Sequence, residues 1–275
     1  MRRRIAGALA ALALVLPAAA VAQDPGALRD RYRLPAPATL EVAARGAWAA
    51  PGIALGIPGG FGADQGDAFV GAGFQHRTRL ENRPDGGLVA GVGIGDARRL
   101  LGLEAAVSSF GTARSCCRGG LSLKLHKLLP SGDASLALGW ENAVTWGRMD
   151  GLDEATDAGT SVYLAGSKVF RLRGNPASPL GTLSLTAGVG TGRFRTEDQI
   201  LDGEETVGVF GGGALRLAAP ASLIVDWTGQ DLVAGLSVVP LRGVPLLVTP
   251  GVADLTTEPR FILGVGYGFN FVQVF

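Results

Sequence analysis

A few charged side chains are isolated within apolar and glycine-rich stretches of the chain. They are Glu104, Lys124, His126, Glu141, Arg216 and Asp226. Carboxylates, ammonium, guanidinium and imidazole groups can pair with one another, exchange protons or attract charged solutes. Which of these they do depends on the elements that carry them, and above all on whether the residues share one enclosed face.

The composition excludes several classes of protein. The 275 residues include 43 glycines, roughly twice the usual share, and the glycines have no three-residue period, which excludes collagen. Hydrophobic residues make up 47% of the chain and charged residues 18%, which argues against disorder. The net charge of +1 argues against sequence-independent nucleic-acid binding, which needs a basic surface.

The first residues have the pattern of an export signal. Three arginines precede an apolar run over 5–16, and Ala20, Val21 and Ala22 supply small residues for a signal peptidase. We expect residues 1–22 to be a signal peptide that is removed, so that the mature protein begins near Gln23. The apolar run is about 12 residues long, whereas a membrane-spanning helix needs about 20.

The mature chain divides into two parts. Residues 23–66 are rich in Ala, Pro and Gly, with little alternation, and we interpret them as a periplasmic lead-in or a partial plug. Residues 67–275 alternate between apolar and small or polar positions in about 12 segments closed by turn residues. The segments are 67–78, 87–95, 101–110, 120–129, 134–146, 160–172, 181–194, 206–217, 221–228, 232–239, 244–253 and 260–275.

Segment length and connection length together favour a membrane barrel. Most segments suit strands that cross a bilayer at a tilt, which takes about 9 to 11 residues. For most of the chain the connections are alternately long and short, as in barrels with short periplasmic turns and longer external loops. The sequence therefore predicts an all-β, antiparallel transmembrane β-barrel of about 12 strands in the outer membrane of a Gram-negative-type bacterium.

The two faces of the predicted strands differ in a way that indicates an enclosed lumen. In 120–129 one face carries Leu121, Leu123 and Leu125, and the other carries Ser122, Lys124 and His126. A soluble β-sandwich would also alternate, but its solvated face would be rich in Lys, Glu and Thr. Here that face carries mainly Gly and Ser with isolated charges. We expect these glycines to let the strands bend as the barrel closes.

The last segment is strongly aromatic on one face. Tyr267, Phe269, Phe271 and Phe275 alternate with Gly and Asn, and the printed chain ends on Phe275. This pattern resembles the signal that the outer-membrane barrel assembly machinery recognises. The predicted partners are therefore this machinery and outer-membrane lipid.

Three stretches resemble a family of uncharacterised bacterial exported barrel proteins. They are Phe61–Arg79, Asp226–Pro240 and Phe261–Phe269. The glycine-rich β pattern also resembles, more distantly, the barrels of exopolysaccharide-secretion operons. The first resemblance implies an outer-membrane barrel, and it brings no substrate or catalytic residue.

Strand pairing predicts how the isolated charges meet. Antiparallel pairing of consecutive strands would place Glu104 opposite Lys124 or His126, and Glu141 near Lys124, all facing the lumen. Unpaired charge in such an interior is costly, so the cluster either compensates its own charges or selects and gates solutes in a pore.

A second pair of lumen charges is predicted on neighbouring strands, between Arg216 and Asp226. Among the residues with reactive side chains, His76 and His126 are tied to no Ser or Asp by a spacing rule, and Cys116 with Cys117 lacks further metal ligands. We expect no enzyme, no metal and no cofactor. The sequence predicts a pore or passive channel for small solutes. The alternative is a structural or secretion-associated barrel whose lumen is blocked by the charge cluster and residues 23–66.

The predicted membrane location has a direct test. Cell fractionation should recover the protein with the outer membrane, and only detergent should release it, because a lipid-facing barrel wall aggregates in water. Recovery from the periplasm without detergent would instead indicate a soluble β protein.

Overall fold

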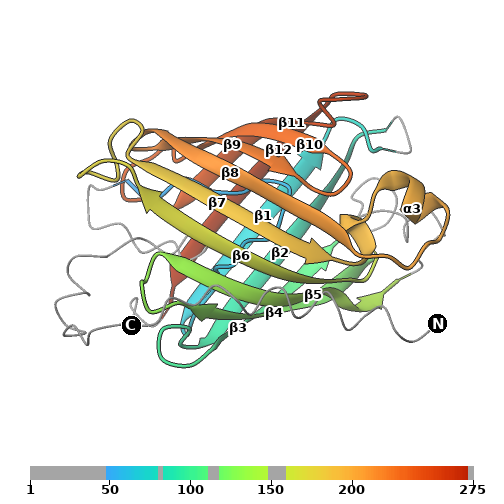
Figure 1. Ribbon diagram of the computed structural model, residues 1–275, viewed down its shortest axis with the longest axis horizontal. Coiled ribbons are helices and arrows are strands. Elements are labelled where there is room, and N and C mark those ends of the chain that lie inside the picture. Colours follow the sequence, from blue (N-terminus) through green and yellow to red (C-terminus); the bar gives the residue numbers. More distant parts are fainter. Residues whose placement is uncertain (1–47, 80–82, 111–117, 148–158, 272–275) are drawn as a thin grey trace, which may run out of the picture. The chain divides into compact units, whose positions relative to one another are not determined.

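The chain forms a closed antiparallel barrel of twelve strands (Figure 1). The computed structural model describes residues 48–79, 83–110, 118–147 and 159–271. The strands are β1 (Asp67–Gln75), β2 (Asp85–Gly95), β3 (Gly102–Ser109), β4 (Gly119–Leu128), β5 (Ala134–Trp146), β6 (Ser161–Arg171), β7 (Thr182–Gly190), β8 (Gly208–Ala218), β9 (Ala221–Trp227), β10 (Leu232–Val238), β11 (Leu246–Ala253) and β12 (Arg260–Asn270). Each strand pairs with its sequence neighbours, and β1 pairs with β12 to close the ring. The predicted all-β, antiparallel fold of about 12 strands is confirmed.

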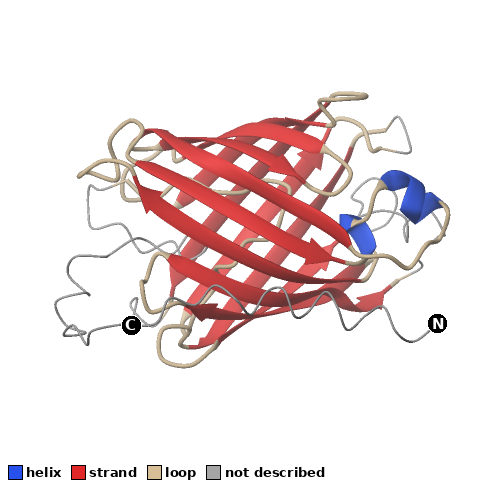
Figure 2. Ribbon diagram, in the orientation of Figure 1, coloured by secondary structure: helices blue, strands red, loops and turns tan. Residues whose placement is uncertain are grey.

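Two short helices lie in the β7–β8 connection, at one end of the barrel (Figure 2). They are η1 (Gly192–Phe194) and α3 (Glu197–Leu201). The prediction of a strand over 181–194 is wrong beyond Gly190, because the chain turns at Gly192, whose φ of 63° favours glycine. Thr196 then starts α3, because its hydroxyl accepts from the Gln199 N–H while the Gln199 side chain accepts from the Thr196 N–H.

The two ends of the barrel differ in their connections. One end, here called the short-turn end, carries the 96–101, 129–133 and 219–220 turns and the start of β1. The other, here called the long-loop end, carries the 191–207 connection. The predicted alternation is confirmed for these, but the β6–β7 connection at the short-turn end, over 172–181, is long and departs from it.

The outward face of the barrel is apolar almost throughout. Exposed Leu, Val and Ile side chains recur at every second position, as in β5, where Leu136, Leu138 and Trp140 are each about half exposed. Exposed aromatics gather toward both ends. They are Phe74, Trp146, Trp227 and Phe261 at the long-loop end, and Phe170, Tyr267 and Phe271 toward the short-turn end. An apolar wall between two aromatic bands is the pattern of a barrel surrounded by lipid.

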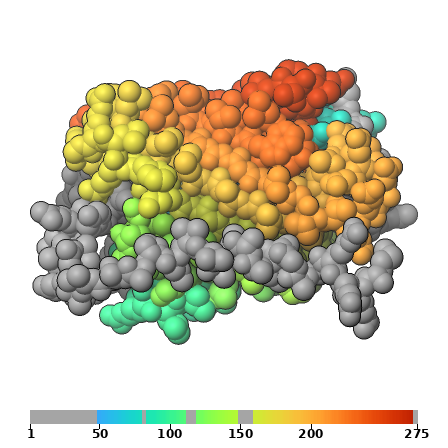
Figure 3. Space-filling model, in the orientation of Figure 1, coloured from blue at the N-terminus to red at the C-terminus, as the bar shows by residue number. Residues whose placement is uncertain are grey.

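The wall is continuous on the side that the space-filling view presents, where β6, β7 and β8 pack without a gap (Figure 3). No helix among the described residues is both long and apolar enough to cross a membrane. Several predicted features lie outside the described residues. They are the signal peptide, residues 23–47 of the lead-in, most of the acidic 147–159 loop, Cys116, Cys117 and Phe275.

The glycines of the inward face make room for atoms inside the barrel. A Cβ on Gly93 would lie 2.2 Å from the Asp64 carbonyl oxygen, and one on Gly102 would lie 2.3 Å from the His126 ring. A Cβ on Gly91 would lie 2.4 Å from the Phe69 ring. These contacts are closer than carbon atoms allow, so glycine here serves close approach as well as the strand bending expected from the sequence.

Substitution of one lumen glycine should therefore act through the barrel interior. We expect Gly93→Ala to lower the free energy of unfolding by about 1–3 kcal/mol, because the added methyl group meets backbone atoms that cannot yield cheaply. Gly266→Ala is the matched control, since a Cβ there meets no atom within 4 Å. The measurement is the temperature of the heat-induced mobility shift on a gel. Equal temperatures for both variants would contradict the close-packing explanation.

Candidate functional site in the barrel lumen

Residues 48–66, here called the internal segment, run through the lumen and belong to the same compact unit as the barrel (Figure 1). The segment starts near the short-turn end, where the Arg242 guanidinium lies 5.1 Å from the Trp48 ring and the Gly52 N–H donates to Ser237 Oγ at 2.8 Å. It rises toward the long-loop end and then returns to the short-turn end, where β1 begins. The lumen therefore holds a folded-back loop of the chain itself.

The tip of the internal segment is bound by two charged side chains. Asp226 Oδ2 accepts the N–H groups of Leu55 and Gly56 at 2.7 and 3.0 Å. Arg193 Nη1 donates to the Gly56 carbonyl oxygen at 3.1 Å. Asp226 is fully buried, so these main-chain donors replace the water that its carboxylate has lost.

Arg193 is itself held by a carboxylate on the barrel wall. Its guanidinium donates to both Glu141 oxygens, from Nε at 2.6 Å and from Nη2 at 2.9 Å. The same guanidinium lies 4.4 Å from the Phe194 ring centroid. A bidentate pair with mostly enclosed partners fixes the position of the cation more tightly than a single bond does.

The returning half of the segment packs closely against the inward face of the paired strands β5 and β6. The Gly60 N–H donates to Ser167 Oγ at 2.9 Å, and Ser135 Oγ donates to the Gly60 carbonyl oxygen at 2.6 Å. A Cβ on Gly60 would lie 2.3 Å from the Ser135 carbonyl oxygen. Glycine is thus required at position 60, because the main chain there lies too close to the wall to carry a side chain.

The segment next meets the predicted charge cluster. Glu104 and Lys124 are direct partners across β3 and β4, and Lys124 Nζ lies 3.1 Å from Glu104 Oε1. Lys124 Nζ also donates to the Phe61 carbonyl oxygen at 3.4 Å, while Glu104 Oε2 accepts the Ala63 N–H at 2.9 Å. The ion pair therefore holds both a donor and an acceptor of the internal main chain.

His126 lies on β4 nearer the short-turn end than Lys124, in close contact with the segment. Its Nε2 is 3.2 Å from Asp64 Oδ1, and Asp64 Oδ1 also accepts the Ala97 N–H at 2.8 Å. A Cβ on Gly62 would lie 2.6 Å from His126 Nδ1. The imidazole is enclosed by the segment on one side and by the glycine of β3 at position 102 on the other.

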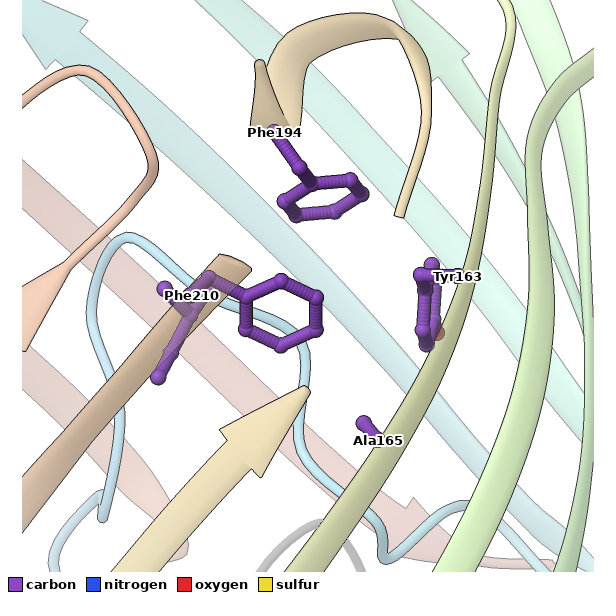
Figure 4. Packing of buried hydrophobic residues seen from close by; sticks show 5 residues of the cluster. Tyr163, Ala165, Phe194 and Phe210 are labelled. Atoms are coloured by element: carbon purple, nitrogen blue, oxygen red, sulfur yellow. The ribbon is translucent and has the colours of Figure 1, made fainter. Parts of the chain in front are cut away.

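Apolar side chains complete the packing between segment and wall. Phe194 is fully buried, with its ring centroid 4.4 Å from that of Phe210 and 5.7 Å from that of Tyr163 (Figure 4). Ile57 of the internal segment joins this cluster, and Phe61 packs with Val169 in a second one. The segment is therefore held by apolar contacts as well as by hydrogen bonds.

The structure places the predicted lumen residues on the inward face but changes two of their partnerships. Glu141 lies near enough to Lys124 to interact with it electrostatically, as predicted, but its hydrogen bonds go to Arg193, and the register places Gly139 opposite Lys124. The 129–133 turn sets this register, which is unbroken from Leu128 opposite Ser135 to Leu123 opposite Trp140. The β4–β5 pairing shifts between Leu121 and Leu123, and Asn142, with a φ of 51°, turns the chain there.

The predicted Arg216–Asp226 pair is not formed. Ser222 lies opposite Arg216, and Gly212 lies opposite Asp226. Arg216 Nη1 instead donates to the carbonyl oxygen of Ala219 in its own turn. The strands are adjacent as expected, but the register separates the two charges along them.

Arg193 is the functional residue that the sequence analysis missed. It was counted as part of a strand, and nothing in its spacing identifies a partner more than fifty positions away at Glu141. The glycines at 188, 190 and 192 around it were the available signal, since they mark a place where the backbone bends and the lumen is crowded.

Comparison with known proteins assigns the chain to no family. No family model matches the chain, and no curated protein matches it. Among solved structures it is similar to a KdgM porin and to a KdgM porin in complex with disordered oligogalacturonate, each at 12% identity and a TM-score of 0.44, covering 74% of this chain and 99% of that one. The fold assignment rests on this chain's own strand pairing. The resemblances to uncharacterised exported barrels and to exopolysaccharide-secretion barrels stay predictions.

No group of three or more His, Cys, Asp or Glu side chains in the described part of the chain is arranged to hold a metal ion. What the lumen offers instead is hydrogen bonding. Its carboxylates, cations and hydroxyls are directed at the main chain of the internal segment.

Removal of the lysine from the ion pair should reveal its stabilising role. We expect Lys124→Ala to lower the free energy of unfolding by about 3–5 kcal/mol, because Glu104 then stays enclosed without its cation. Glu104→Gln combined with Lys124→Ala should recover part of that loss. Thermal unfolding of the folded barrel measures both. A Lys124→Ala variant as stable as the unaltered protein would show that the pair does not stabilise the fold.

Proposed function

We propose that this chain is a bacterial outer-membrane barrel that acts as a porin-like channel for small solutes, and that the internal segment restricts its lumen. The observation that carries the proposal is the division between the two faces of the wall. The outward face is apolar between two aromatic bands, as a lipid-surrounded barrel requires. The inward face carries Glu104, Lys124, Glu141 and Asp226 along the path of the lumen.

The outer membrane is the location that this architecture fits best. The expected export signal at residues 1–22 and the aromatic β12 strand, with Tyr267 and Phe269 and with Phe271 directly after it, support delivery to the barrel assembly machinery. In this orientation the short-turn end faces the periplasm and the long-loop end faces outward. The internal segment then enters from the periplasmic side.

The restriction follows from the contacts of the internal segment. It is bound to side chains of β3, β4, β5, β6, β9 and β10, so it spans the lumen rather than lining one wall. Solutes pass when the segment shifts, and the charges that bind its main chain then face the solute. Glu104 and Lys124 become the selecting groups at that point.

The same contacts favour a second function. A lumen filled by its own chain also suits a structural or secretion-associated barrel with no transport of its own. The two functions differ in whether the segment leaves its position. A non-enzymatic role is common to both, because His126, although close to Asp64, is only 3% exposed and its ring packs against Gly62 and Gly102.

Planar-bilayer conductance separates the two functions. We expect the unaltered protein to open rarely and Asp226→Ala to raise the open fraction about tenfold, because the Leu55 and Gly56 N–H groups lose a charge-assisted acceptor worth roughly 1–3 kcal/mol. Arg216→Ala is the matched control, since Arg216 is a lumen-facing charge that binds its own turn.

Steady openings that increase in Asp226→Ala but not in Arg216→Ala would support the channel. Folded barrels that stay silent in all three forms would overturn it and favour the structural function. Folding is checked independently by heat-dependent gel mobility.

A further inference from the structure

An ion-pair network joins separate connections at the long-loop end. Arg79 lies in the connection after β1, and its Nη1 is 2.6 Å from Glu197 Oε2 of α3. Arg79 also pairs with Asp231 in the β9–β10 turn, and Asp231 pairs with Arg260 at the start of β12. The side chains of Arg79, Asp231 and Arg260 are mostly enclosed. These contacts fix the β7–β8 connection to the β1–β2 connection.

The strand order shows where around the ring the two connections arise. Strands β3 to β6 separate the two connections on one side of the ring, and β9 to β12 separate them on the other. The connections therefore arise from opposite sides of the barrel, and an Arg79–Glu197 pair between them has to cross the mouth. The 191–207 connection is here called the lid.

The inner end of the lid reaches into the lumen. Phe194 is fully buried, and a Cβ on Gly208 or Gly229 would collide with its backbone. Beside it, Gln230 Nε2 donates to the Arg193 carbonyl oxygen at 2.7 Å. Arg193 is therefore fixed at its main chain to the mouth and at its guanidinium to the tip of the internal segment.

We propose that the lid and the internal segment are mechanically coupled through Arg193, so that lifting the lid withdraws this side chain from Gly56 and releases the tip. The inference deepens the proposed channel function and rests on it for its physiological meaning. Arg193 and Glu197 lie within one short connection, one on each side of the η1–α3 junction. A displacement that separates Glu197 from Arg79 therefore moves η1 and its arginine as well.

The exposures of the two ties give the order of events. The Glu197 side chain is 44% exposed, and an ion pair with an exposed partner contributes little to stability. The Arg193–Glu141 pair has side chains that are 16% and 19% exposed and two bonds. The outer tie breaks first, and Arg193 then acts as the latch on the segment.

A thiol-accessibility experiment tests the coupling without relying on conductance. The background is the full chain with Cys116→Ser and Cys117→Ser, and the reporter is Ala54→Cys, since Ala54 packs against the Phe194 cluster near the tip. A bulky, water-soluble maleimide measures the labelling rate in the detergent-folded barrel. The variants are Arg193→Ala, the milder Arg193→Lys, and Arg79→Ala, which removes the Glu197 tie together with the Asp231 pair and does not touch the segment.

Arg77→Ala is the matched control. Arg77 lies in the same connection as Arg79 but pairs with Glu258 in the β11–β12 connection at 2.9 Å, so it leaves the lid in place. We expect labelling to rise about tenfold in Arg193→Ala, less in Arg193→Lys, and severalfold in Arg79→Ala, with no change in Arg77→Ala.

The outcomes are decisive in either direction. A rise in Arg193→Ala without one in Arg79→Ala would show that the lid and the segment move independently, and would overturn the coupling. Unchanged labelling in every folded variant would also overturn it. Raised labelling in a barrel that never conducts would support the latch while rejecting the channel, so failures of the two proposals remain distinguishable.

Discussion

The polar groups enclosed by the barrel have to be satisfied without bulk water, and this constraint organises the lumen. A buried carboxylate such as Asp226 is costly unless it is hydrogen-bonded. The internal segment supplies the partners, because an extended main chain presents both N–H donors and carbonyl acceptors. Carboxylates accept from it at Gly56 and Ala63, and cations donate to it at Gly56 and Phe61. Wall and segment therefore depend on each other.

Close packing adds a second requirement, which explains much of the glycine content. The internal segment runs inside a ring of twelve strands, and little space is left for side chains between the segment and the wall. At Gly60, Gly93 and Gly102 even a methyl group would meet backbone atoms or the His126 ring. Other glycines, at positions 190, 208 and 229, leave room for Phe194 at the mouth. Displacement of the segment would leave a lumen lined by glycine and paired charge.

The barrel thus combines a stable outer wall with an internal segment that is held by fewer interactions. The wall is held by a continuous strand ladder, and the segment is held by a limited set of charge-assisted bonds and two apolar clusters. Local openings draw on the less stable parts of a fold. Passage of a solute therefore requires the segment to move while the ladder stays intact, which is the physical content of the proposed channel.

Local pattern alone determined the strands, because side-chain alternation at period two reports which face is enclosed wherever a strand runs. It placed Glu104, Lys124, His126 and Glu141 on the inward face and left Lys124 or His126 as the partner of Glu104, of which the structure has Lys124. The partners of Glu141 and Asp226 were decided only by the tertiary structure. Arg193 and Gly56 reach these partners from segments distant in sequence. No periodicity encodes such contacts, since they exist only once the ring has closed around its own chain.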